Sequence, residues 1–179
     1  MLQKDVAKEV MTNETRNEIL GRIYATTKLE DLGEADIVIE AISENYEVKR
    51  NLFTHLSEVI RSPQSTILAS NTSSISITKL AATYCQPERF VGMHFMNPVP
   101  VMKLVEIICG KQTSEHTLST VRELATRMGK TTTTSQDIPG FIANRPVSMM
   151  KFRVYLVHSR ILPGDQRQRD LQSRRDSQY

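Results

Sequence analysis

Short runs of apolar, largely β-branched residues alternate along this chain with amphipathic stretches, and this alternation strongly limits the possible folds. The run at 35–42 (ADIVIEAI) is continuously apolar in character, which is typical of a strand covered on both faces. Apolar residues at helical spacing follow at 45–60, and a second buried run follows at 66–70. This order predicts an α/β domain with a doubly wound, largely parallel sheet.

The remaining segments extend the same pattern. We expect helices at 76–84 and 114–128, and strands at 90–95, 104–109 and 131–135. Residues 2–21 are expected to form two helical pieces, the second capped by Thr12 and ending near Gly21. Residues 137–145 are expected to form a turn that leads into a helix.

The charge is unevenly distributed. Residues 146–179 hold 7 Lys and Arg against 3 Asp and Glu, whereas residues 1–145 hold 16 against 17. The basic excess therefore belongs to the C-terminal segment and does not indicate a nucleic-acid partner for the folded part. Trp is absent and aromatic residues are few, so stacking platforms for bases find no support either.

The compartment follows from what the sequence contains. The first ten residues (MLQKDVAKEV) are charged and lack the apolar segment of a secretory signal. No apolar stretch approaches the ~18–20 residues that span a bilayer. We expect a soluble intracellular protein, cytoplasmic by default and without a membrane partner, in which Cys85 and Cys109 are free thiols.

Glu106 is the most informative polar residue, because it lies inside the apolar strand LVEII. Burial of a carboxylate without a partner costs several kcal/mol. Lys103 should point to the other face, so His94, near the end of the preceding strand, is the better partner. A carboxylate fixes the tautomer of an imidazole and raises its basicity, as a general base requires. The alternative is an exposed Glu106 at a sheet edge and a structural His94.

Other polar residues carry weaker signals. The turn at 71–74 (NTSS) follows a buried strand, at the edge where parallel sheets bind ligands. It serves as an N-cap for the next helix, as a ligand contact, or as both. Spacing alone assigns Glu44 and Lys49 to a solvated face around the start of the helix at 45–60, and Asn144 is unremarkable by itself.

Taken together, four segments resemble the 3-hydroxyacyl-CoA dehydrogenase family. They are ADIVIEAISENYEVKRNLF, ILASNTSSISIT, RFVGMHFMNPVPVMKLVEII and DIPGFIANR, in the order and spacing of that family, and they cover about residues 25–145. The resemblance implies a Rossmann-like domain and an NAD-dependent oxidoreductase of fatty acid metabolism. The implied reaction interconverts a (3S)-3-hydroxyacyl-CoA and a 3-oxoacyl-CoA.

The resemblance also implies roles for individual residues. His94 would be the catalytic base, Glu106 its orienting partner, and Ser73 and Asn144 the groups that hold and polarise the substrate oxygen. The residues that would line the nicotinamide cofactor are Glu44, Lys49, Ser73 and Asn97. No metal is implied.

Two departures from the family pattern qualify these expectations. Family members begin with a strand and a GxGxxG turn that holds the cofactor pyrophosphate, and this sequence has no such turn. We therefore expect residues 1–145 to form an incomplete Rossmann-like domain without its first βαβ unit. NAD binding would then be compromised, and the isolated chain inactive or severely impaired.

After Arg145 the sequence no longer matches the helical domain through which the family dimerises. A frame change or misjoined exon is the simplest account of residues 146–179, and we expect disorder from about residue 163. The alternatives are an inactive truncated or misspliced form, an enzyme whose missing half another chain supplies, or a binding protein that reuses the fold. Acyl chain length, oligomeric state and organelle stay open.

Overall fold

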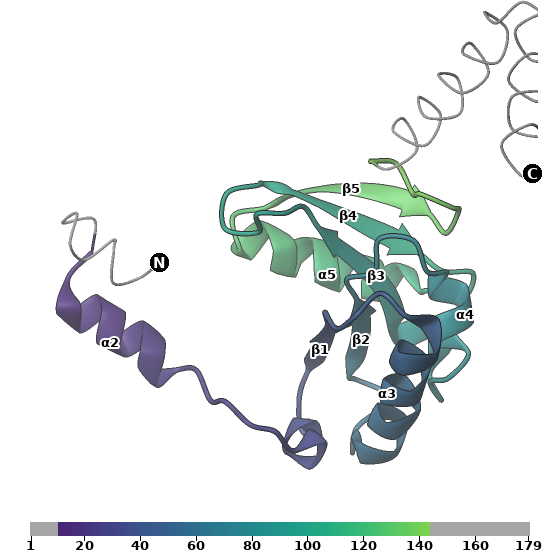
Figure 1. Ribbon diagram of the computed structural model, residues 1–179, viewed down its shortest axis with the longest axis horizontal. Coiled ribbons are helices and arrows are strands. Elements are labelled where there is room, and N and C mark those ends of the chain that lie inside the picture. The colour runs from purple at the N-terminus through teal and green to yellow at the C-terminus, as the bar shows by residue number, and fades with distance from the viewer. Residues whose placement is uncertain (1–10, 144–179) are drawn as a thin grey trace, which may run out of the picture.

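A five-stranded sheet forms the centre of the protein in this computed structural model, which describes residues 11–143 (Figure 1). The strands lie side by side in chain order, β1-β2-β3-β4-β5. All neighbours are parallel except β3 and β4, which form an antiparallel pair. The strands are β1 (Ile37–Glu40), β2 (Ile67–Ser70), β3 (Phe90–Phe95), β4 (Leu104–Cys109) and β5 (Thr131–Gln136).

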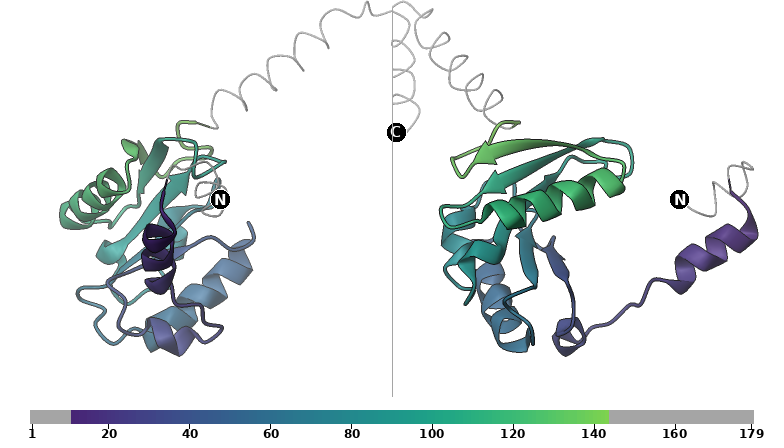
Figure 2. Two further views of the ribbon diagram at one scale, coloured as in Figure 1. Left: turned by 90° about the vertical axis from the view of Figure 1, so that its left-hand side faces the viewer. Right: turned by 180° about the vertical axis from the view of Figure 1, so that it is seen from behind.

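Helices cover both faces of the sheet, which gives three layers (Figure 2). The helices α3 (Tyr46–Val59) and α4 (Ile77–Ala81) pack on one face, where Phe53 and Leu80 meet Phe90 and Ile108. The helix α5 (Glu115–Arg127) packs on the other face through Leu118, Val121 and Ala125. Successive residues of β3 therefore alternate between two cores, because strand side chains point to opposite faces.

Side-chain caps fix where the longer helices begin. Asn45 accepts a hydrogen bond from the Val48 N–H (3.1 Å) at the start of α3, and Ser114 accepts one from the Thr117 N–H (3.2 Å) at the start of α5. Short 3-10 helices, η1 (Leu29–Leu32) and η2 (Pro87–Arg89), precede β1 and β3.

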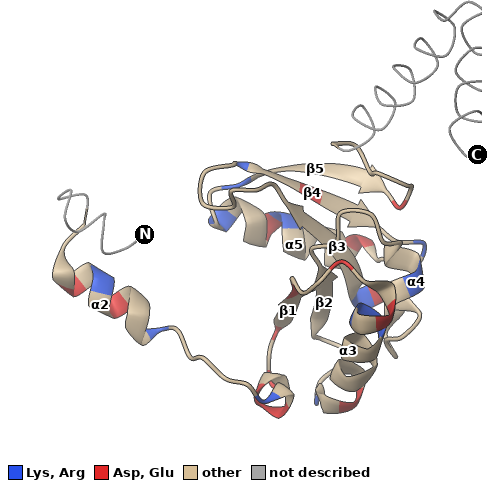
Figure 3. Ribbon diagram, viewed as in Figure 1, with Lys and Arg blue, Asp and Glu red and all other residues tan. Residues whose placement is uncertain are grey.

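The helix α2 (Asn13–Gly21) stands apart from the sheet, and an extended segment joins it to η1 (Figures 1 and 2). None of its residues is buried, and Thr12 caps it by accepting the Thr15 N–H (3.2 Å). Lys, Arg, Asp and Glu are interspersed on α2, α3 and α5 (Figure 3), so none of these helices presents a surface of one sign.

The predicted fold class is confirmed. The bounds of β3 and β4 agree with the sequence, whereas the run at 35–42 forms a strand only at Ile37–Glu40 and the helix at 76–84 only at Ile77–Ala81. Both cysteines are free, as predicted. Within residues 11–143 no helix is long and apolar enough to cross a membrane. The first predicted helical piece and the segment 146–179 lie outside the described residues.

Candidate functional site

The antiparallel pair β3–β4 places His94 directly opposite Glu106. Both residues are buried, with exposed fractions of 7% and 0%. The His94 Nδ1 lies 2.8 Å from the Glu106 Oε2, so the predicted partnership is confirmed and the alternative of an exposed Glu106 is wrong. The antiparallel pairing of β3 and β4 makes this contact possible, because cross-strand neighbours in such a pair are close enough for side chains to meet.

The second oxygen of Glu106 is held by the turn that follows β5. The backbone N–H groups of Ile142 and Ala143 both donate to its Oε1, at 3.0 and 2.9 Å. Gly140 and Phe141 precede them with φ values of 78° and 47°, which turn the chain so that two successive N–H groups face one oxygen. The Glu106 carboxylate thus accepts three hydrogen bonds while fully buried, which offsets the cost of its burial.

This arrangement selects one tautomer of His94. A carboxylate can only accept, so Nδ1 carries the proton and donates it to Glu106. Nε2 then has a free lone pair on the opposite side of the ring. The Ser73 Oγ lies 3.2 Å from Nε2 and donates to it. The Phe141 ring lies edge-on to the imidazole at 6.0 Å between centroids and closes one side.

Ser73 belongs to the turn after β2, and Glu44 holds that turn from the β1–α3 loop. The Glu44 Oε1 accepts from the Thr72 Oγ1 (2.6 Å), the Ser73 N–H (2.9 Å) and the Ser74 N–H (3.0 Å). Burial would raise the pKa of Glu44, but these hydrogen bonds and the Lys49 charge together hold that pKa below its ordinary value. Glu44 is therefore an ionised, partly exposed acceptor at the carboxyl edge of the parallel strands.

The interpretation of Lys49 as part of a solvated face is wrong. Its side chain is 1% exposed, and its Nζ contacts the Glu40 Oε1, the Ile42 carbonyl (3.3 Å) and the Glu44 Oε2 (3.6 Å). Sequence analysis missed Glu40, which lies within the apolar run at 35–42. The signal was present, because a carboxylate in a buried strand requires a partner, as Glu106 does.

Of the two remaining predicted residues, the structure describes one. Asn97 follows β3 and is exposed, and Asn144 falls outside the described residues. The cap of α4 is Ser76 rather than the turn at 71–74, because the Ser76 Oγ accepts the Lys79 N–H (3.3 Å). Asp137 supports that start by accepting from the Ile77 and Thr78 N–H groups (3.0 and 2.8 Å).

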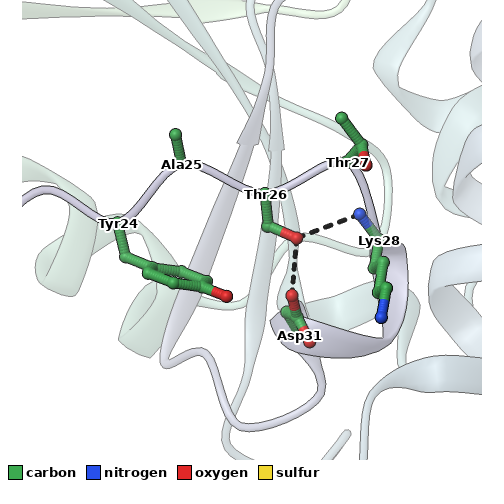
Figure 4. Close-up of a pocket in the computed structure, with 6 residues that line it drawn as sticks. All are labelled: Tyr24, Ala25, Thr26, Thr27, Lys28 and Asp31. Atoms are coloured by element: carbon green, nitrogen blue, oxygen red, sulfur yellow. Dashed lines mark hydrogen bonds between the residues drawn. The ribbon is translucent and has the colours of Figure 1, made fainter.

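A separate pocket lies along the segment that leads to η1 (Figure 4). One stretch of chain lines it, from Tyr24 to Lys28 with Asp31. The Thr26 Oγ1 points toward Asp31 and donates to its Oδ2 at 2.5 Å. None of its lining residues belongs to the His94 centre, so this pocket is separate from the candidate site.

Comparison with known proteins places this geometry in context. The model of the family "3-hydroxyacyl-CoA dehydrogenase, NAD binding domain" matches residues 1–138. The chain belongs to this family. A 3-hydroxybutyryl-CoA dehydrogenase of Bradyrhizobium diazoefficiens is 49% identical over 144 residues, which cover 80% of this chain and 48% of that protein. A probable 3-hydroxybutyryl-CoA dehydrogenase of Bacillus subtilis is 47% identical over 158 residues, 88% of this chain and 54% of that protein.

A solved structure of a related enzyme has the same fold as this chain. The crystal structure of an (S)-3-hydroxybutyryl-CoA dehydrogenase from Ralstonia eutropha superposes with a TM-score of 0.82 at 40% identity, over 92% of this chain and 58% of that chain. The predicted membership of the 3-hydroxyacyl-CoA dehydrogenase family, and NAD as its cofactor, are therefore confirmed at the level of the family. The chain spans about half the length of the curated relatives it matches.

Proposed function

We propose that this site interconverts a (3S)-3-hydroxyacyl-CoA and a 3-oxoacyl-CoA with NAD as the hydride carrier. The observation that supports it best is the continuous line of hydrogen bonds from Ser73 through His94 to Glu106. This line presents a basic nitrogen and a hydroxyl at one position, with a buried carboxylate behind the nitrogen. Family membership supplies the class of substrate.

His94 acts as the general base in this proposal. Its Nε2 takes the proton of the substrate 3-hydroxyl, and the resulting imidazolium is stabilised by Glu106 across the 2.8 Å contact. Ser73 donates to the substrate oxygen, and Asn144 polarises the same oxygen. NAD would accept the hydride that leaves C3 of the substrate. The products are then the 3-oxoacyl-CoA, NADH and one proton. In the reverse direction His94 returns its proton to the carbonyl oxygen.

The residues present fit one end of the cofactor. An ionised carboxylate such as Glu44 repels phosphate but accepts from an amide NH₂, so it suits the nicotinamide carboxamide rather than the pyrophosphate. Ser73 and Asn97 would lie along the same edge. Lys49 is almost fully buried, so we propose that it acts on the cofactor through Glu44.

We also propose that a protein made of these 179 residues alone catalyses this reaction slowly or not at all. The sequence contains no GxGxxG turn for the pyrophosphate, and within residues 11–143 strand β1 pairs only with β2. The described residues contain no all-helical domain either, so the dimer expected from the family would need residues beyond them.

Two assays separate these proposals. The purified chain should not oxidise NADH in the presence of acetoacetyl-CoA. A chimera that places residues 25–143 inside a full-length family member should reduce NAD with (3S)-3-hydroxybutyryl-CoA, and His94→Ala should abolish this. Turnover by the chain alone that disappears in His94→Ala would contradict the proposed impairment. A folded chimera without turnover would contradict the proposed reaction.

A further inference from the structure

Glu40 is a buried carboxylate whose contacts the proposed mechanism does not use. Its side chain, at the end of β1, is 0% exposed, and both carboxylate oxygens are engaged. Oε1 accepts from the Lys49 Nζ and from the Ile42 N–H at 2.7 Å, while Oε2 accepts from the Ser70 Oγ at 2.6 Å. Glu40 cannot contact substrate or cofactor from this position, so any role in the reaction must act through its neighbours.

Lys49 connects Glu40 to the turn that carries Ser73. Its ammonium lies between two carboxylates, in contact with Glu40 and 3.6 Å from the Glu44 Oε2. Glu44 uses its other oxygen to accept the Thr72 hydroxyl and the Ser73 and Ser74 N–H groups. The position of the Lys49 charge therefore determines how Glu44 divides its oxygens between the lysine and the turn.

Ser70 provides a second connection to the same turn. Its hydroxyl proton is committed to the Glu40 Oε2, which orients the oxygen so that it accepts the Thr72 N–H at 3.3 Å. Both connections start at Glu40 and end within Thr72–Ser74. They meet next to Ser73, whose Oγ lies 3.2 Å from the His94 Nε2.

We propose that Glu40 is a positioning residue that fixes the turn at 72–74, and with it the hydroxyl of Ser73, through Lys49 and Ser70. Without the Glu40 charge, the Lys49 ammonium pairs with Glu44 and draws that carboxylate away from the turn. The reason is that a buried ammonium without a counter-charge is costly, and Glu44 is the carboxylate that remains near it. This inference rests on the proposed function for the meaning of the Ser73 position. The contacts themselves are tested without turnover.

The test measures hydrogen exchange of the Ser73 and Ser74 amides, and the His94 Nε2 resonance, by NMR of the ¹⁵N-labelled chain. In Glu40→Gln both amides should exchange roughly tenfold faster or more, the effect expected when a hydrogen bond to a charged acceptor is lost. The Nε2 resonance should shift. The matched control is Glu47→Gln on α3, whose exposed pair with Arg50 (2.9 Å) has no contact with the turn. It should leave all three signals unchanged.

A neutral pair, Glu40→Gln with Lys49→Met, separates positioning from stability. Replacement of a buried ion pair by uncharged residues of similar size commonly preserves the fold. The proposal predicts a folded protein in which Ser73 and Ser74 exchange much more slowly than in Glu40→Gln and close to the wild-type rate, because no ammonium remains to draw Glu44 away from the turn. Fast exchange in the neutral pair, or wild-type exchange in a folded Glu40→Gln, would overturn the proposal. So would a neutral pair that fails to fold, because the ion pair would then serve the fold itself. An inactive chimera would count against the proposed reaction alone.

Discussion

Replacement of Glu106 by Gln should reverse the tautomer of His94. The carboxylate accepts from His94 on one oxygen and from the Ile142 and Ala143 N–H groups on the other. Gln has the same shape but only one acceptor oxygen, and its NH₂ group donates. The amide oxygen can therefore face either His94 or the Ile142 and Ala143 N–H groups, but not both.

The hydrogen bonds in the structure allow the free energies of these two amide orientations to be compared. An unsatisfied buried donor costs about 1–3 kcal/mol. Turning the amide oxygen toward His94 would leave two backbone donors unsatisfied, at about 2–6 kcal/mol in total. The opposite orientation affects only the imidazole, which can move its proton to Nε2 and accept the amide NH₂ at Nδ1. The second arrangement is preferred, so Nδ1 becomes the acceptor and Nε2 carries the proton. The nitrogen that acts as the base in the proposed mechanism is then blocked.

The assay is ¹⁵N NMR of the imidazole nitrogens in the uniformly labelled chain, with His94 assigned through His94→Gln. The wild type should show a protonated Nδ1 and an unprotonated Nε2, and Glu106→Gln the reverse. Glu115→Gln, next to the exposed His116, serves as a control that should not change His94. A His94 that keeps its proton on Nδ1 in Glu106→Gln would refute the account of the three hydrogen bonds.

Three further predictions concern stability, measured by denaturant unfolding. Gly92→Ala should lose about 1–3 kcal/mol, because its Cβ would lie 2.7 Å from the Ile108 Cβ, whereas Gly21→Ala should be tolerated. Burial would raise the pKa of Asp137, but hydrogen bonds to its carboxylate lower it below its ordinary value. The ionised group therefore stabilises the fold above about pH 4, and this contribution is lost as the pH falls. Asp137→Asn should make the free energy of unfolding less dependent on pH in this acid range. Burial raises the pKa of Tyr84 to about 12, so its stabilisation is complete below about pH 10 and lost above it; Tyr84→Phe should remove this alkaline step.

The sequence predicted those parts of the fold that depend on local pattern. The bounds of β3 and β4 follow from apolar runs between clear turn residues. Glu106 could be paired with His94 from the sequence alone, because a carboxylate in an apolar strand needs a partner and few were near. The free-energy cost of burying an unpaired carboxylate, rather than a sequence motif, made that contact predictable.

Contacts that join side chains or backbone groups of different elements were not predictable in this way. Glu40 and Lys49 are nine positions apart, with no helical or strand periodicity that relates them, and they meet only because a tight connection joins β1 to α3. The positive φ angles of Gly140 and Phe141 direct two N–H groups at Glu106, and no local propensity of Phe favours that conformation. These features depend on tertiary packing that overrides local preference.

Loss of the base itself tests the central claim most directly. In the chimera that carries residues 25–143, kcat/KM for NAD reduction with (3S)-3-hydroxybutyryl-CoA should fall by roughly 10²–10⁴ in His94→Gln, the usual contribution of a general base. His116→Gln, at an exposed histidine of the same segment, should leave it unchanged. A folded His94→Gln chimera with undiminished kcat/KM would contradict the assignment of His94 as the base that Glu106 orients.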